Sequence, residues 1–285
     1  MRPATLGLLA PGSLLFSALV IYPILANIWL SFHEWDAVSA KIWIGFQNYS
    51  ELFADPVFYT ALANNLRWLA LYMLAPLFGL VLALFVNQPI LGIRLVHSLF
   101  FLPFVISQVV VGLIFSWFFN TRFGLFNQLL AWLGMEPMEL LDGEGSAIYA
   151  VIVAGLWPQT AYCMILYLTG LASLDDELID AARLEGAKGW RLFWEVVFPQ
   201  LRPVNFIAVM VSIVSALRSF DYVIIMTVGG PYDSSTVLAY YMYEQTFTAL
   251  RYGYGAAVAT ILLALMSGVV CTFLWRLLRA EDRIR

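Results

Sequence analysis

Six long apolar stretches, separated by polar or Gly/Pro-rich segments, dominate the 285-residue chain. Each is at least about 20 residues long, the length that an α-helix needs to cross roughly 30 Å of hydrocarbon. The pattern predicts an all-α integral membrane protein with six spans in a single transmembrane domain over residues 1–285. The predicted spans are residues 6–32, 66–86, 95–119, 147–171, 204–228 and 256–278.

Composition supports this class and excludes others. Hydrophobic residues make up 62% of the chain and charged residues 12%, whereas about a quarter of a soluble domain is charged. A net charge of -4 gives no general attraction to nucleic acid, so we expect no such partner. Two cysteines and two histidines cannot build a disulfide framework or a metal cluster. Neither lysine lies in a P-loop motif, so we expect no metal or cofactor in this chain, and any ATP and Mg²⁺ on another chain.

The distribution of basic residues predicts the orientation of the spans. Lysine and arginine concentrate in the cytoplasmic loops of membrane proteins. With the N-terminus inside, ten basic residues are internal: Arg2, Arg94, Arg183, Lys188, Arg191, Arg202, Arg276, Arg279, Arg283 and Arg285. Four are external: Lys41, Arg67, Arg122 and Arg251. Both termini are therefore predicted to be cytoplasmic. The first span exceeds the 7 to 15 residues of a cleavable signal and is expected to remain as an anchor.

The long inner loop at residues 173–203 predicts two short helices. Ser173 is the expected N-cap of the first, and Gly186 is expected to end it in the left-handed conformation. This helix has an apolar stripe of low relief, which suits insertion into a groove of another protein. The stripe consists of Leu174, Leu178, Ala181 and Ala182.

The second helix is predicted at about residues 190–198, followed by two prolines. One side of it carries Trp190, Phe193, Trp194 and Val197. The pattern leaves an alternative open, in which both helices of the loop lie on the membrane surface.

The same loop resembles the signature loop of the membrane subunits of binding-protein-dependent ABC importers, which begins Glu-Ala-Ala and centres on a glycine. The resemblance is carried by Asp180-Ala181-Ala182, Gly186-Ala187, Phe193, Pro199 and Pro203. Asp180 replaces the usual Glu and Glu185 the usual Asp, so the charges are kept. The resemblance implies a coupling helix that docks into an ATPase subunit. The implied coupling residues are Asp180, Ala181, Ala182, Glu185, Gly186, Ala187, Phe193 and Pro199.

Further motifs narrow the resemblance to the first permease of carbohydrate importers of the maltose and glycerol-phosphate type. They are Gly45-Phe46-Gln47-Asn48-Tyr49, Asp55-Pro56, Asn64-Asn65, Leu102-Pro103 and Thr227-Val228-Gly229-Gly230-Pro231. The resemblance implies the type I permease fold in a bacterial inner membrane and a transport subunit rather than an enzyme. It also implies a heterodimer with a second permease, two ATPase subunits, an extracytoplasmic solute-binding protein and a sugar-like solute. Gly229, Gly230 and Pro231 would lie on the binding-protein side.

Polar side chains inside spans mark a candidate solute path, because they are costly when they face lipid. The fifth span has a stripe of them at helical spacing, flanked by Arg218 and Asp221. The stripe consists of Asn205, Ser212, Ser215, Ser219 and Tyr222. The predicted path is lined by Gln108, Gln159, Tyr162, Ser215, Ser219, Asp221 and Tyr222. Alternatively, the serines only allow close helix packing, and Arg218 pairs with Asp221.

Tyrosines are frequent in the outer segment 229–255. They could stack on sugar rings or form an interfacial belt, which is the commoner role of tyrosines near a span end. They are Tyr240, Tyr241, Tyr243, Tyr252 and Tyr254.

An ion-coupled secondary carrier and a membrane-embedded enzyme are the two alternative functional classes. An ion-coupled secondary carrier often has paired interrupted helices at mid-membrane, and the sequence indicates none beyond the Arg218/Asp221 region. A membrane-embedded enzyme would need a histidine cluster, a nucleophile motif or a carboxylate pair, and none stands out in the spans.

Overall fold

The computed structural model describes residues 3–88 and 92–282, so Arg2, Arg283 and Arg285 of the orientation argument lie outside the described residues. The chain divides into two compact units. Unit 1 comprises residues 3–60 and 238–269, and unit 2 comprises residues 61–237 and 270–282. Four described helices are long and apolar enough to cross a membrane, or up to six spans if each of two bent helix pairs counts as one.

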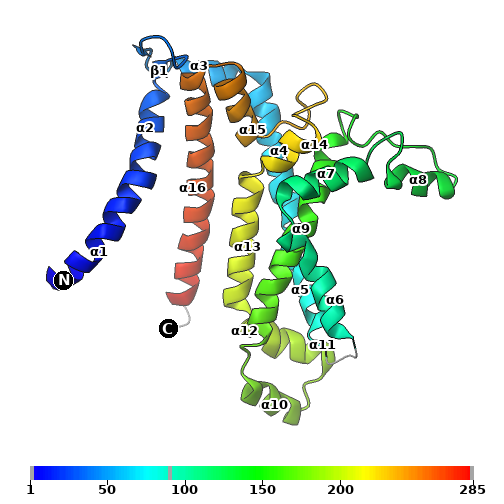
Figure 1. Ribbon diagram of the computed structural model, residues 1–285. Helices are drawn as coiled ribbons and strands as arrows, with labels where there is room; N and C mark the ends of the chain where they lie inside the picture. The colour runs from blue at the N-terminus through cyan, green and yellow to red at the C-terminus, as the bar shows by residue number, and fades with distance from the viewer. Residues whose placement is uncertain (1–2, 89–91, 283–285) are drawn as a thin grey trace. The chain divides into compact units, whose positions relative to one another are not determined.

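Three predicted spans correspond to continuous helical segments (Figure 1). The first is formed by α1 (Pro3–Phe16), the five-residue π-helix η1 (Ser17–Ile21) and α2 (Tyr22–Leu30). The fourth, α9 (Ala147–Leu171), has the predicted bounds. The sixth, α16 (Tyr252–Asp282), begins four residues before its predicted start.

The second span begins ten residues earlier than predicted. It consists of α4 (Pro56–Tyr72) and α5 (Leu74–Val86). Asp55 starts α4, because its Oδ1 accepts a hydrogen bond from the Val57 N–H at 2.8 Å and Pro56 occupies the first helical position. The polar residues Asn64 and Asn65, expected at the entry of this span, are buried within α4.

The third span is not one helix, as predicted, but two helices bent by 101°: α6 (Ile93–Val105) and α7 (Gln108–Phe118). Ile106 and Ser107 between them have extended backbones. Pro103 lies inside α6 and does not itself mark the break; the Ser107 hydroxyl starts α7 by accepting from the Val110 N–H at 3.4 Å.

The fifth predicted span is also interrupted. Helix α13 (Arg202–Leu217) ends before residues 218–220, and α14 (Asp221–Met226) follows. The Ala216 carbonyl near the end of α13 accepts from the Ser219 N–H at 3.4 Å, from the Ser219 hydroxyl at 2.9 Å and from the Asn65 amide at 3.5 Å. The helix can therefore stop without leaving that carbonyl unsatisfied.

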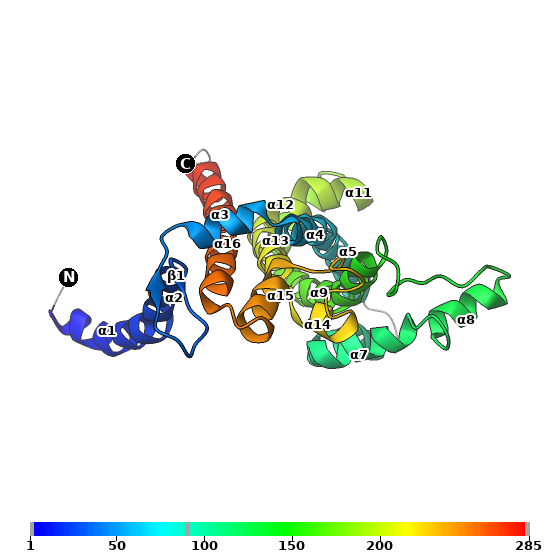
Figure 2. The ribbon, with the colours of Figure 1, turned by 90° about the horizontal axis from the view of Figure 1, so that it is seen from above.

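Helix α9 forms the centre of unit 2 and packs against α5, α6, α7, α13 and α14 (Figure 1). The core includes Ala75 and Ala83 of α5 with Met164 of α9. Gly79 allows the closest approach, because a Cβ there would lie 2.5 Å from the Cβ of Cys163. Helix α8 (Leu125–Trp132) extends away from this core in both views (Figures 1 and 2).

The 173–203 loop forms two helical arms. The first is α10 (Asp176–Leu184); the second contains α11 (Gly189–Leu192), the π-helix η2 (Phe193–Val197) and α12 (Phe198–Gln200). The predicted N-cap, Ser173, is wrong: its hydroxyl donates to the Gly170 carbonyl at the end of α9. Asp175 caps α10 instead, accepting from the N–H groups of Glu177 and Leu178.

Gly186 ends α10 as predicted, with φ of +92°. The Gly186 N–H donates to the Arg183 carbonyl at 3.0 Å and the Ala187 N–H to the Ala182 carbonyl at 2.9 Å. These two bonds define a Schellman motif, in which the left-handed position favours glycine.

Unit 1 contains α1, η1, α2 and most of α16, together with several short elements. They are β1 (His33–Glu34), β2 (Ile42–Trp43), α3 (Gln47–Ala54), α15 (Leu238–Tyr243) and η3 (Glu244–Thr248). The two strands pair antiparallel with His33 opposite Trp43, a small exception to the expected all-α chain. Asn48 of α3 fixes the turn after α2 by donating to the carbonyls of Ser31 and His33 at 2.8 and 3.0 Å.

Three of the five outer tyrosines are buried, and so are not available for an exposed interfacial belt or for stacking on a sugar. They are Tyr240, Tyr241 and Tyr254. The hydroxyls of Tyr241 and Tyr254 both donate to the Asp55 carboxylate, which ties α15 and α16 to the start of α4.

Candidate functional site

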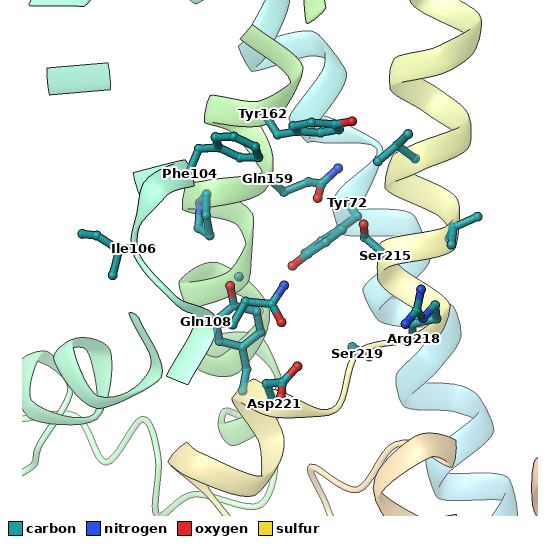
Figure 3. Close-up of a pocket in the computed structure, with 15 residues that line it drawn as sticks. Tyr72, Phe104, Ile106, Gln108, Gln159, Tyr162, Ser215, Arg218, Ser219 and Asp221 are labelled. Carbon is teal, nitrogen blue, oxygen red and sulfur yellow. The ribbon is translucent and has the colours of Figure 1, made fainter. Parts of the chain in front are cut away.

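Unit 2 encloses a cavity of about 400 Å³ that all seven predicted path residues line (Figure 3). Gln159 and Tyr162 come from α9, and Ser215 comes from α13. The remaining four are Gln108, Ser219, Asp221 and Tyr222. Residues from four separate helices therefore converge on one space, which spacing within a single helix could not establish.

The two helix breaks of unit 2 adjoin this cavity. Ile106 lies in the break between α6 and α7 and Gln108 begins α7, while Ser219 lies in the break between α13 and α14. The predicted continuous stripe is therefore wrong, because Ser219 and Tyr222 lie beyond the end of α13. Asn205 does not line the cavity.

A buried hydrogen-bond chain supports one wall. The Gln159 amide donates to the Ser212 hydroxyl at 3.0 Å, and that hydroxyl donates to the Ala208 carbonyl at 2.8 Å. Ser212 is fully buried behind the wall and joins α9 to α13 rather than facing the cavity. This arrangement restricts the orientation of Gln159.

Several polar side chains of the cavity wall make no side-chain hydrogen bond or ion pair within the described part of the chain, and could bind water or a ligand. They are the side chains of Gln108, Tyr162, Ser215, Arg218 and Asp221. Because polar groups gain from being hydrogen-bonded, the cavity suits water or a polar solute.

The alternative ion pair between Arg218 and Asp221 is not formed. The three ion pairs among the described residues are elsewhere, and both side chains line the cavity (Figure 3). The break in the helix removes the helical three-residue spacing that would have placed them together. The wall thus carries one positive and one negative charge.

The sequence reasoning missed two aromatic residues of the wall, Tyr72 and Phe104. The Phe104 ring stacks on Tyr162, with centroids 5.2 Å apart and an interplanar angle of 21°. Tyr72 lies against Gly155, where a Cβ would collide with its hydroxyl. The hydroxyl of Tyr72, inside an apolar span, could have indicated a position on the cavity wall. Phe104 is an apolar residue among apolar residues, so the sequence contained no indication of its position.

The 173–203 loop contains a groove of about 460 Å³ between α10 and the second arm. It is lined by Leu178, Ala181, Ala182, Glu185, Glu195, Val196, Pro199 and Gln200. Four of the eight predicted coupling residues are in this list. The other four are not: Asp180 pairs with Arg183 on the exposed side, Gly186 ends α10, Ala187 is buried, and Phe193 packs on the core.

The Gly229-Gly230-Pro231 turn is held by α4. The Asn64 amide donates to the carbonyls of Ser234 and Thr236 at 2.7 and 2.8 Å. The Gly229 carbonyl accepts from the Ser235 N–H at 3.1 Å, and Gly229 has φ of +79°. The turn is therefore an ordered part of unit 2.

The sequence model of one family, the binding-protein-dependent transport system inner membrane component, matches residues 54–281. The chain belongs to this family. It is a permease, and hence a multi-pass membrane component of a transport system.

Relatives and a solved structure agree with this assignment. The permease is 36% identical over 88% of both chains to "Probable ABC transporter permease protein YurN" of Bacillus subtilis. It is 32% identical to the sulfoquinovosyl glycerol transport system permease protein SmoG of Agrobacterium fabrum, over 96% of this chain and 90% of that protein. A chain of a bacterial ABC transporter for alginate import has the same fold, with TM-score 0.83, 23% identity and coverage of 96% and 94%.

The family assignment decides against the rival classes, but the expectation that no helix is interrupted outside the Arg218/Asp221 region was wrong. The permease does have interrupted helices, at α6/α7 and at α13/α14, and both interruptions adjoin the cavity. Interrupted helices therefore do not distinguish the classes here. Membership of a binding-protein-dependent transport family does.

Proposed function

We propose that this permease is one of two different membrane subunits of an ATP-driven importer for a sugar-like solute, which an extracytoplasmic binding protein delivers. The convergence of the seven path residues on one cavity carries the proposal. Two relatives support the solute class: SmoG is named for sulfoquinovosyl glycerol, and a Thermococcus litoralis relative, 27% identical, is named for trehalose and maltose.

The chemistry of the cavity suits a carbohydrate. Amide, serine and tyrosine groups both donate and accept, as a polyhydroxylated solute requires. The stacked Phe104–Tyr162 pair offers an aromatic surface for the apolar face of a sugar ring. Arg218 and Asp221 balance in charge, so the wall has no net attraction for an ion of either sign.

The permease would lie in a bacterial inner membrane with six spans, each bent pair counted as one, and with both termini in the cytoplasm. The excess of basic residues on the termini and the 173–203 loop supports this orientation. Gly229, Gly230 and Pro231 would then face the binding protein. ATP and Mg²⁺ would be bound by two separate ATPase subunits, which contact the 173–203 loop.

A continuous physical connection links that loop to the cavity. The Asp175 N–H at the start of α10 donates to the Gln200 side chain of α12 at 3.1 Å. Only Leu201 separates α12 from α13, and α13 carries Ser215 at the cavity. Closure of the ATPase subunits would displace α10, and α12 and α13 would transmit the displacement to the helix break at residues 218–220.

The decisive test is transport by the complete complex reconstituted in proteoliposomes, with a panel of labelled sugars. We expect uptake that requires ATP, the ATPase subunits and the binding protein, and that persists after ion gradients are dissipated. Uptake driven by an ion gradient without the ATPase subunits would favour the secondary carrier. Uptake of amino acids or peptides but no sugar would overturn the solute class.

A further inference from the structure

The second arm of the 173–203 loop exposes a cluster of large aromatic rings. Trp190 is 75% exposed and Trp194 is 44% exposed. The ring centroids of Trp190 and Trp194 are 5.4 Å apart, and those of Trp194 and Phe198 are 4.6 Å apart. A tryptophan ring has a large apolar surface and one polar N–H group. An exposed cluster of such rings therefore indicates contact with an environment intermediate between water and hydrocarbon.

The other sides of this arm already have defined surroundings. Phe193, Val197 and Phe198 pack against the apolar core formed by α5, α9 and α13. Glu195, Val196, Pro199 and Gln200 line the groove that faces α10. Arg191 and Glu195 form an exposed ion pair at 3.0 Å. The tryptophan side adjoins the core-facing side through Phe193 and Phe198, both in ring contact with Trp194.

The direction of the arm places this aromatic side near the end of a span. The arm is bent by 71° from α13, with only Leu201 between them. If α13 crosses the bilayer, the arm runs closer to the plane of the membrane than to its normal. Figure 1 shows α10 beyond α11 and α12, at the end of unit 2 where α9 and α13 meet the loop.

Basic residues flank the arm at both ends. Lys188 precedes α11 and Arg202 follows Leu201, and both are exposed. Tryptophan rings favour the headgroup level of a bilayer, and basic side chains favour anionic lipid headgroups. The combination fits a lipid surface better than the cytosol.

We propose that α11, η2 and α12 form an interfacial anchor, with Trp190 and Trp194 in the headgroup region of the cytoplasmic leaflet and Lys188 and Arg202 at lipid phosphates. The assignment to that leaflet rests on the proposed orientation. The anchor fixes one wall of the α10 groove to the membrane surface, while α10, on the far side of the groove, remains available to the ATPase. The two arms of the loop therefore have different partners: lipid for the second and protein for the first.

Spin labels on the reconstituted complex test this anchor. Cysteine would be introduced by Trp190→Cys and, separately, by Glu195→Cys, whose side chain is 58% exposed at the edge of the α10 groove on the same arm. The background carries Cys271→Ser, because Cys271 is exposed and Cys163 is buried. Accessibility to oxygen, which partitions into lipid, is compared with accessibility to a water-soluble nickel chelate. We expect a several-fold higher oxygen-to-nickel ratio at position 190 than at position 195.

Two outcomes would overturn the anchor. Equal nickel accessibility at positions 190 and 195 would place the arm in water, and exclusion of both reagents at 190 would place it against a protein subunit. If the Trp190→Cys variant does not assemble, Trp194→Cys provides the same comparison. Sugar uptake is measured on the same unlabelled complexes, so failure of the anchor is distinguishable from failure of the transport function.

Discussion

The Asn64 side-chain amide donates to the carbonyl of Thr236 at 2.8 Å, across 172 positions of sequence. A second bond from the same amide group reaches the Ser234 carbonyl at 2.7 Å, and Asn64 is fully buried. Helix α4 thus fixes the segment that follows the Gly229-Gly230-Pro231 turn. Its neighbour Asn65 contributes to the end of α13 at the cavity. The Asn64-Asn65 motif therefore holds both the segment after the turn and the end of α13 beside the cavity.

Replacing Asn64 by Ala should destabilise the permease by about 2–4 kcal/mol, because three hydrogen bonds are lost: two that Asn64 donates to the Ser234 and Thr236 carbonyls and one that it accepts from Arg67. Thermal unfolding of the purified protein in detergent measures the effect. Asn87→Ala, at an exposed position after α5, is the matched control and should change stability little. Equal stability of the two variants would contradict a structural role for Asn64.

Ser215→Leu should reduce sugar uptake about tenfold or more while the complex still assembles, because an apolar side chain would fill and desolvate the polar cavity. Ser267→Leu makes the same chemical change at an exposed position of α16 and should leave uptake near the parental level. Co-purification of all subunits verifies assembly. Normal uptake by Ser215→Leu would exclude this cavity from the solute path.

Gly186→Glu should uncouple ATP hydrolysis from uptake. A non-glycine residue at φ of +92° costs about 1–3 kcal/mol, and the end of α10 would lose its Schellman geometry. Gly186→Asn should retain more coupling, because asparagine tolerates the left-handed region. The ratio of solute transported to ATP hydrolysed is the readout. An unchanged ratio in Gly186→Glu would show that this geometry is not needed for docking.

Gly79→Ala should destabilise the α5–α9 contact by about 1–3 kcal/mol, because the added Cβ would lie 2.5 Å from Cys163 Cβ and 2.8 Å from the Met164 nitrogen. Gly12→Ala in α1 meets nothing within 4 Å and should be neutral or slightly stabilising. Unfolding midpoints of the two variants provide the comparison. If Gly79→Ala were as stable as Gly12→Ala, α5 and α9 could move apart to accommodate the methyl group without loss of stability, and the predicted effect would be contradicted.

Asp36 should keep its turn ordered at unusually low pH. Hydrogen bonds from the Ser39 hydroxyl and from the Ser39 and Val38 N–H groups lower the pKa of Asp36 from 3.8 to about 2. A lowered pKa means that the contribution is complete above the ordinary value and is lost as pH falls through about 2. Hydrogen exchange of a peptide covering residues 35–42 follows the loss. Ser39→Ala should move it to higher pH, and an unchanged midpoint would contradict this account.

Local signals predicted several elements correctly. The apolar length of residues 147–171 gave α9 its bounds, and Gly186 was identified as the residue that ends α10. Both follow from interactions within a few residues along the chain. Ser173 shows how a local rule can fail: its hydroxyl bonds back to α9, and the Asp175 carboxylate takes over as the cap.

The candidate path was predicted as a set of residues but with the wrong local geometry. Polarity inside apolar stretches identified Gln108, Gln159 and Ser215, because such groups are costly in lipid. It could not indicate that the third and fifth spans are interrupted, or that Arg218 and Asp221 stay apart. Tyr72 was missed because its position at the cavity depends on the packing of α4 against Gly155 of α9.

The sequence alone determined the membrane class, the approximate spans and the polar residues that line the cavity, since hydrophobicity and helix-capping chemistry act over short stretches of chain. Only the tertiary structure decided where the helices break and which side chains share a cavity. The physical reason is that these features depend on contacts between residues far apart in the sequence. The Ala216 carbonyl near the end of α13, for example, accepts a hydrogen bond from Asn65, 151 positions away, and no local pattern records that bond.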